Sequence, residues 1–192
     1  MHLSPLKYLH IAGAAPFASR ANYNQYLNGM LRIVSAMSRF QYIFHRGDSM
    51  GVHGGEWRVH ASAVDDIQVI EDSLAWLSGD ITSVSTHKDK SALGAPMFTI
   101  ISKMTAKQSI FSLGRLQSES VKQILDSGFG SRIDEDKFLH LRIDLDALCR
   151  GEGEISVDKN AMVAKGRFKL EVYPGQSVNE VAMGIFLDLR DK

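Results

Sequence analysis

The chain has 192 residues, of which 44% are hydrophobic and 23% charged. This composition is typical of one large or two small globular domains and excludes extensive disorder. Its 22 Lys and Arg residues balance 22 Asp and Glu residues, which argues against strong nucleic-acid binding through an overall basic excess and leaves a local basic stripe as the alternative. A single cysteine, Cys149, excludes an intramolecular disulfide, and no apolar run reaches the roughly 18 residues of a membrane span. We therefore expect a cytoplasmic protein without a membrane segment.

The first half alternates strand and helix patterns. Ser62 is a natural N-cap, and Asp65 and Asp66 would favour the first turn of a helix that ends at Gly79. Gly54 and Gly55 suggest a turn before a strand. The spacing of apolar residues predicts strands at 6–11, 41–45, 56–60 and 81–86, and helices at 23–40 and 62–79.

The second half is less regular. Its patterns predict strands at 97–104, 138–143, 167–173 and 181–189, and a helix at 113–125. The order of the first half, βαββαβ, is that of a ferredoxin-like unit. We therefore predict an α+β fold in which a ferredoxin-like half, residues 1–90, is followed by a less regular sheet-based half, residues 96–192, packed on the first. The segment 88–96 would link them.

Candidate chemical groups are sparse. His45, His53 and His60 lie close in sequence and could meet across a hairpin, but their spacing is irregular and no cysteine accompanies them. Asp144 and Asp146 share one face of a predicted strand, where a solvated acidic edge is the simpler interpretation. We expect neither a metal ion nor a cofactor.

Several blocks together resemble a known family. They are Leu27–Ala36 (LNGMLRIVSA), Trp57–Ser62 (WRVHAS), Ser102–Lys107 (SKMTAK) and Phe168–Val172 (FKLEV). These blocks are similar to segments of the Csy-type endoribonuclease of type I-F CRISPR systems, a member of the RAMP superfamily that processes CRISPR repeat RNA. The resemblance covers scattered parts of most of the chain and agrees with the ferredoxin-like expectation.

The resemblance implies cleavage of repeat RNA without metal, through a helix His, a late Ser and an arginine-rich helix that grips the RNA stem. This chain departs from that pattern, since Arg32 stands near the position of the His and Lys159–Val163 lacks the Ser. The helix that should be rich in arginine holds few basic residues. The RNA-binding positions that the resemblance carries over are Lys103, Lys107, Arg115 and Lys122.

Three functions follow as hypotheses. The first is a catalytically degenerate relative that binds a subunit of the type I-F CRISPR surveillance complex, as an anti-CRISPR inhibitor that mimics the native subunit. The second is an active, metal-independent endoribonuclease and crRNA-binding subunit, with a rearranged site drawn from His45, His53, His60 and Ser156. The third is an unrelated α+β interaction module. The first is favoured, so the expected partners are subunits of that complex and CRISPR repeat RNA, and enzymatic activity is not favoured.

Overall fold

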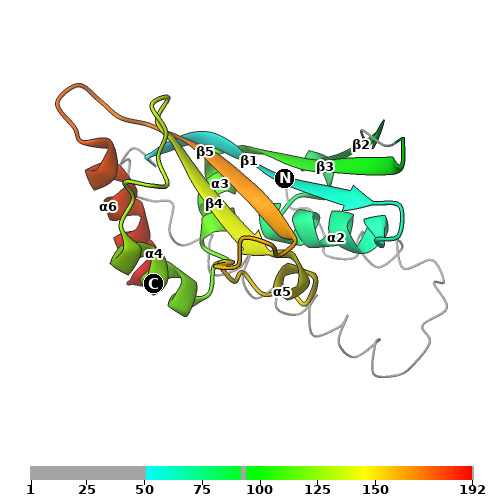
Figure 1. Ribbon diagram of the computed structural model, residues 1–192. Helices are drawn as coiled ribbons and strands as arrows, with labels where there is room; N and C mark the ends of the chain where they lie inside the picture. The colour runs from blue at the N-terminus through cyan, green and yellow to red at the C-terminus, as the bar shows by residue number, and fades with distance from the viewer. Residues whose placement is uncertain (1–50, 92–93, 192) are drawn as a thin grey trace, which may run out of the picture. The chain divides into compact units, whose positions relative to one another are not determined.

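The computed structural model describes residues 51–91 and 94–191. Within them, five strands form one antiparallel sheet in the order β2-β3-β1-β5-β4 (Figure 1). The predicted elements at 6–11, 23–40 and 41–45 lie outside the described residues, so the ferredoxin-like start is not confirmed, whereas the α+β class is confirmed. The strands are β1 (Val52–Ser62), β2 (Val84–Lys90), β3 (Pro96–Thr105), β4 (Phe138–Asp144) and β5 (Val163–Leu170).

Helices connect most of these strands. β1 and β2 both pair antiparallel with β3, so they run parallel to each other with β3 between them. The connection from β1 to β2 is therefore a split βαβ unit. The helices in the described part of the chain are α2 (Ile67–Ser78), the short 3₁₀ helix η2 (Ile81–Ser83), α3 (Ala106–Leu113), α4 (Ser118–Ser127), α5 (Leu145–Cys149) and α6 (Val178–Arg190). Among the described residues, no helix is long and apolar enough to cross a membrane.

Helix α2 begins later than its sequence predicts. β1 continues through Ser62, which pairs with Met97 of β3, and the N-cap is Asp66, whose carboxylate accepts a hydrogen bond from the Val69 N–H at 3.3 Å. Ser62 instead donates its own N–H to the Asp65 carboxylate at 2.6 Å. The predicted N-cap was therefore wrong, because sheet pairing extends the strand past a residue that could have capped a helix. The predicted end at Gly79 is confirmed by its left-handed φ of 77°.

Other boundaries also differ from the predictions. The predicted turn at Gly54 and Gly55 was wrong, because both residues belong to β1, where the pairing with β5 shifts register after Val52. The predicted helix at 113–125 corresponds mainly to α4, because α3 already ends at Leu113 and residues 114–117 separate the two helices. The predicted strand at 181–189 is part of α6, which begins with a capping box in which the Glu180 carboxylate accepts from the Ser177 N–H at 3.3 Å.

Strands on both sides of the expected link, residues 88–96, belong to the same sheet. Residues 84–90 of β2 and 96–102 of β3 pair as a hairpin around that segment. β1, from the first expected unit, pairs with both β3 and β5 from the second. The described parts of the two expected units therefore share one sheet.

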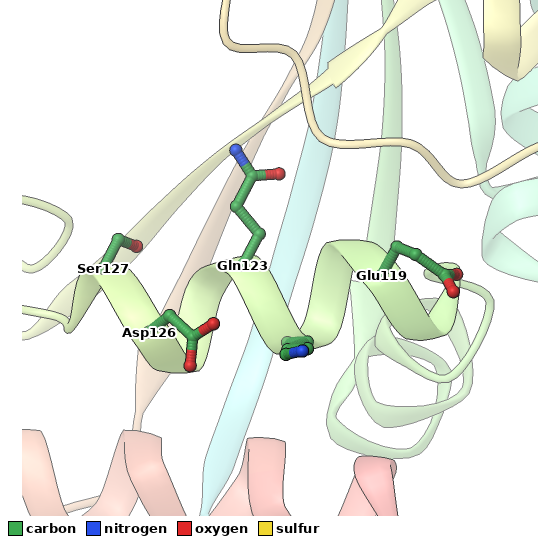
Figure 2. A pocket seen from close by; sticks show the side chains of 5 residues that line it. Glu119, Gln123, Asp126 and Ser127 are labelled. Carbon is green, nitrogen blue, oxygen red and sulfur yellow. The ribbon is translucent and has the colours of Figure 1, made fainter.

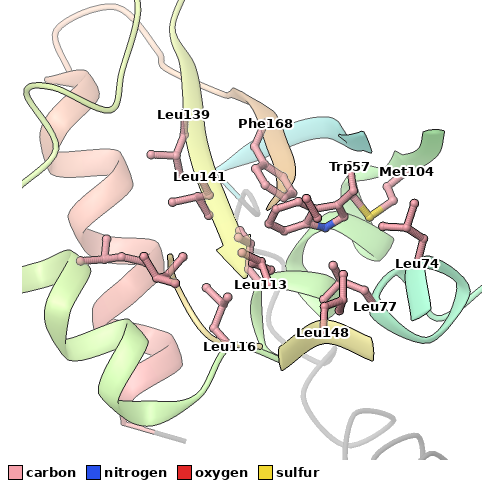
Figure 3. Packing of buried hydrophobic residues seen from close by; sticks show 14 of the residues in the cluster. Trp57, Leu74, Leu77, Met104, Leu113, Leu116, Leu139, Leu141, Leu148 and Phe168 are labelled. Atoms are coloured by element: carbon pink, nitrogen blue, oxygen red, sulfur yellow. The ribbon is translucent and has the colours of Figure 1, made fainter. Parts of the chain in front are cut away.

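The hydrophobic core lies on one face of this sheet and includes buried residues of α2, α3, α4, α5 and α6 (Figure 1). Trp57 is at its centre, with its ring 5.2 Å from that of Phe168 at an interplanar angle of 80°, an edge-to-face arrangement. Gly166 makes room for the indole, since a Cβ there would lie 2.4 Å from the Trp57 ring. Figure 3 shows Leu74 and Leu77 of α2 directed at the same core. The opposite face of the sheet therefore presents its outward residues away from this core.

Candidate nucleic-acid interface

The outward face of the sheet is rich in basic side chains. The burial of alternate residues fixes which side chains point away from the core. We call this surface the basic face, and its basic residues are Arg58 of β1, Lys103 of β3, Arg142 of β4 and Lys165, Arg167 and Lys169 of β5. The carboxylates at outward positions of the same four strands are Glu56 and Asp144, and Asp144 also caps α5 by accepting from the Ala147 N–H at 2.9 Å.

Three of these basic residues form a row across neighbouring strands. Lys165 pairs with Arg58 on one side and with Arg142 on the other, so the three side chains stand in register on β1, β5 and β4. Directly opposed side chains on one face of a sheet have Cβ atoms about 5 Å apart, and like charges at these positions are destabilising. Without a bound anion, repulsion between the charges of this row therefore destabilises the folded protein.

The charges of the row are only partly compensated. The Arg58 Nη2 donates to Glu56 Oε1 at 2.8 Å, but its buried Nε has no acceptor among the described residues. Arg142 Nη2 donates to the main-chain oxygens of Asp158 and Lys159 at 3.4 and 3.3 Å. The exposed Lys165 side chain makes no hydrogen bond or ion pair with any residue that the structure describes. The Lys165 ammonium is therefore open to an incoming anion.

One aromatic ring accompanies the cations on the basic face. The Arg167 guanidinium lies 3.6 Å from the centroid of the Phe138 ring, and the Lys169 ammonium lies 4.5 Å from it. These cation–π contacts hold two flexible side chains close to the sheet surface. Within the described strands, Phe138 is the aromatic residue at an outward position, so stacking surface on this face is limited.

Two histidines lie beside the cations. His60 is two residues from Arg58, and its Nδ1 is 3.2 Å from Thr99 Oγ1 on β3. Burial lowers the pKa of His60, and the positive charges of Lys165 and Arg58 lower it further. His140 on β4 hydrogen-bonds to the Asp134 carboxylate at 2.7 Å, and this bond lowers the pKa of Asp134. Burial is the larger cause of the lowered His60 pKa, and the nearby Lys165 and Arg58 charges add to it.

The four RNA-binding positions expected from the sequence do not form one surface. Lys103 lies on the basic face, whereas Lys107 is in the first turn of α3 and Arg115 follows that helix. Lys122 lies on α4, at a shallow hollow of about 450 Å³. Figure 2 shows Glu119, Gln123, Asp126 and Ser127 of the same helix around this hollow. Its two carboxylates make it a poor site for a polyanion.

The candidate catalytic residues also stay apart. His45 lies outside the described residues. His53 and His60 are seven positions apart on β1, which corresponds to about 23 Å in an extended strand. Ser156 bonds through its N–H to Arg142 O beside β4, three chain spacings from β1, or about 14 Å. His53, His60 and Ser156 therefore do not form a His–Ser pair, and the described residues contain no cluster of three metal-ligating side chains.

Sequence reasoning missed the residues at the centre of the basic face. The signal was present in β5, where Lys165, Arg167 and Lys169 alternate with Gly166 and Phe168. A strand with basic residues at every second position presents them all on one face. The positions of Arg58 and Arg142 beside them could be known only from the strand register.

Comparisons with known proteins support the fold. No family model matches the chain, and no curated protein matches it. Among solved structures, it is similar to a DUF54 protein from Methanothermobacter thermautotrophicus, with 17% identity and a TM-score of 0.57 over 72% of this chain and 97% of that one. It is also similar to a DUF54 protein from Archaeoglobus fulgidus, with 20% identity and a TM-score of 0.57 over 72% of this chain and 99% of that one. A DUF54 protein from Sulfolobus solfataricus matches with 15% identity and a TM-score of 0.51 over 72% of this chain and 95% of that one.

These similarities correct the resemblance inferred from the sequence. The matched structures are DUF54 proteins with no link to CRISPR systems, so the Csy-type, RAMP-superfamily and anti-CRISPR interpretations and the repeat-endoribonuclease alternative were wrong. The physical reason is that Trp57–Ser62 and the first three residues of Phe168–Val172 are alternating strand segments, and this pattern recurs in unrelated sheets. The expected CRISPR partners lose their basis with it. What the comparisons establish for this chain is the fold.

Proposed function

We propose that this protein binds single-stranded nucleic acid on the basic face of its sheet. The observation that carries the proposal is the in-register row of Arg58, Lys165 and Arg142. A row of like charges opposes folding, and phosphate groups bound across it would convert that repulsion into attraction. The zero net charge of the chain does not conflict with this function, because the six basic residues of this face outnumber the two carboxylates at outward positions of the same strands.

A single strand fits this surface better than a duplex. An open sheet face lets an extended strand lie across neighbouring β-strands, with phosphates near cations and bases near aromatic or guanidinium planes. Arg58, Arg142 and Arg167 supply planar groups, whereas Phe138 is already covered by Arg167 and Lys169. We therefore expect phosphate contacts to dominate, with weak sequence preference and strong salt dependence.

The test is fluorescence anisotropy with a labelled oligouridylate about 12 nucleotides long, a length within the range of single-strand sites. Three phosphate contacts predict a slope of log K against log salt of about −2, since each contact contributes about −0.7 on a single strand. Replacing Lys165 by Ala should weaken binding about three- to tenfold and reduce the slope by about 0.7. The same variant should unfold at an equal or higher temperature, because a like-charge opposition is removed.

The matched control is Lys122→Ala, which removes one lysine from α4, away from the basic face. This variant should bind as the wild type does. Equal weakening by Lys122→Ala and Lys165→Ala, or salt-independent binding, would show that the basic face is not the site. Oligodeoxyuridylate and a duplex of the same length complete the experiment, since a preference for RNA over DNA would indicate contacts to the ribose 2′-hydroxyl.

A further inference from the structure

A second cationic group lies on the helical side of the molecule, apart from the basic face. Arg115 follows α3, and its guanidinium carbon is 4.4 Å from the centroid of the Trp76 ring of α2 and 4.5 Å from that of Phe111 of α3. These two aromatic contacts hold the planar group in place. Burial also lowers the pKa of Arg115 to about 10, which leaves the group charged at neutral pH.

The hydrogen-bonding state of this guanidinium is unusual. Its Nε and Nη2 are both buried, and neither has a hydrogen-bond partner in the described part of the chain. These two nitrogens lie on one edge of the guanidinium plane, and their N–H groups form the fork that binds a carboxylate in a bidentate manner. Buried donors are normally paired, and an unpaired one costs about 1–3 kcal/mol, more for a charged group.

The main chain of Arg115 is firmly placed. Its N–H donates to Ser112 O at 3.0 Å. The next two residues pair with Gly153, since Leu116 forms a β-bridge with it and the Gln117 N–H donates to Gly153 O at 2.9 Å. A Cβ on Gly153 would lie 2.3 Å from Arg115 O, so these two segments of the chain pack together without room for a side chain at residue 153. The backbone that carries the unpaired fork is therefore fixed by the fold.

We propose that the Arg115 fork, between Trp76 and Phe111, is a binding site for a small monocarboxylate. Two parallel N–H···O bonds would satisfy both donors. The aromatic surroundings favour a planar, singly charged anion with an apolar body over inorganic phosphate, because the cost of removing an anion from water rises with its charge. Both donors are closed to solvent, so neighbouring side chains must shift as the ligand enters.

The test is thermal unfolding of the full chain in sodium butyrate, acetate or phosphate, with sodium chloride at equal ionic strength as the reference. Ligand binding to the folded state raises the midpoint temperature in a saturable manner. We expect this rise with butyrate and acetate, together with a change in tryptophan fluorescence, since Trp76 contacts the guanidinium. The variant Arg115→Met should unfold at an equal or higher temperature without ligand, because an unpaired buried charge is removed, and should show no saturable rise.

Arg115→Lys keeps the charge but loses the fork, so its butyrate affinity should fall at least about tenfold. This second variant preserves the test if Arg115→Met does not fold. Equal responses of the wild type and both variants, no saturable response of the wild type, or stabilisation by phosphate alone would each overturn the proposal. Oligonucleotide binding by the variants should be unchanged, so this site is tested independently of the basic face.

Discussion

At the scale of single residues, one buried hydrogen bond connects the sheet to a helix. The Trp57 indole N–H donates to the Ser112 hydroxyl of α3 at 2.6 Å, and both side chains are fully buried. Replacing Ser112 by Ala should lower the free energy of unfolding by about 1–3 kcal/mol, because the indole N–H is left without a partner in an apolar core. Urea denaturation of the wild type and of Ser112→Ala measures this difference in the free energy of unfolding.

The control for this prediction is a double-mutant cycle with Trp57→Phe. If the hydrogen bond carries the effect, the loss from Ser112→Ala should be much smaller in the Trp57→Phe background, with a coupling of about 1 kcal/mol. Losses that simply add would instead assign the effect of Ser112→Ala to its own packing in α3.

At the scale of elements, the turn before β4 is strained. Lys137 has a φ of 62°, the one positive φ among the described non-glycine residues, and its N–H donates to Asp134 O at 3.0 Å. A non-glycine residue in this left-handed conformation costs about 1 kcal/mol, so Lys137→Gly should raise the free energy of unfolding by up to about that amount. Thermal or urea unfolding checks the gain.

The same substitution also tests the extent of the basic face. Lys137 lies one residue before Phe138, next to Lys169 at a groove of about 350 Å³. We expect Lys137→Gly to weaken oligonucleotide binding slightly through the loss of one nearby charge. Lys137→Ala separates the two effects, since it removes the charge and keeps the strained φ. A gain in stability from Lys137→Ala equal to that from Lys137→Gly would contradict the strain argument.

At the scale of the whole molecule, binding should depend on pH through the basic face. The pKa of His60 lies below its ordinary value of 6.5, first because of burial and then because of Lys165 and Arg58. A phosphate bound nearby would favour the protonated imidazole. Oligonucleotide affinity should therefore rise as pH falls below about 6.5, and His60→Ala should reduce this rise. His140, held by Asp134 on the same face, is present in both proteins and cancels in the comparison.

The free protein should show the opposite trend in stability. Since His60 has a lower pKa folded than unfolded, the unfolded chain binds the proton more readily. Its contribution to stability is full above pH 6.5 and is lost as pH falls through the lower folded pKa. Thermal unfolding of the wild type and His60→Ala across this range should show a steeper loss for the wild type. If the stability of the wild type and of His60→Ala depended on pH identically, His60 would account for neither the pH dependence of stability nor that of oligonucleotide binding.

The sequence by itself determined the α+β class and the strands at β3 and β4, because alternating apolar residues bury one face of a strand locally. It also determined the end of α2, because Gly79 alone among the neighbouring residues adopts a left-handed φ without strain. It failed at 181–189, where an apolar run fits a strand or a helix and the Ser177–Glu180 capping box was the deciding signal.

Only the tertiary structure decided the candidate site. Arg58, Arg142 and Lys165 are far apart in the sequence, and the pairing of β1, β5 and β4 places them in one row. A shift of one residue in any pairing would turn one of these charges into the core. The proposed carboxylate site at Arg115 likewise depends on the contacts of its guanidinium with Trp76 and Phe111. Strand register and contacts between distant side chains are cooperative properties of the packed chain, and local patterns do not encode them.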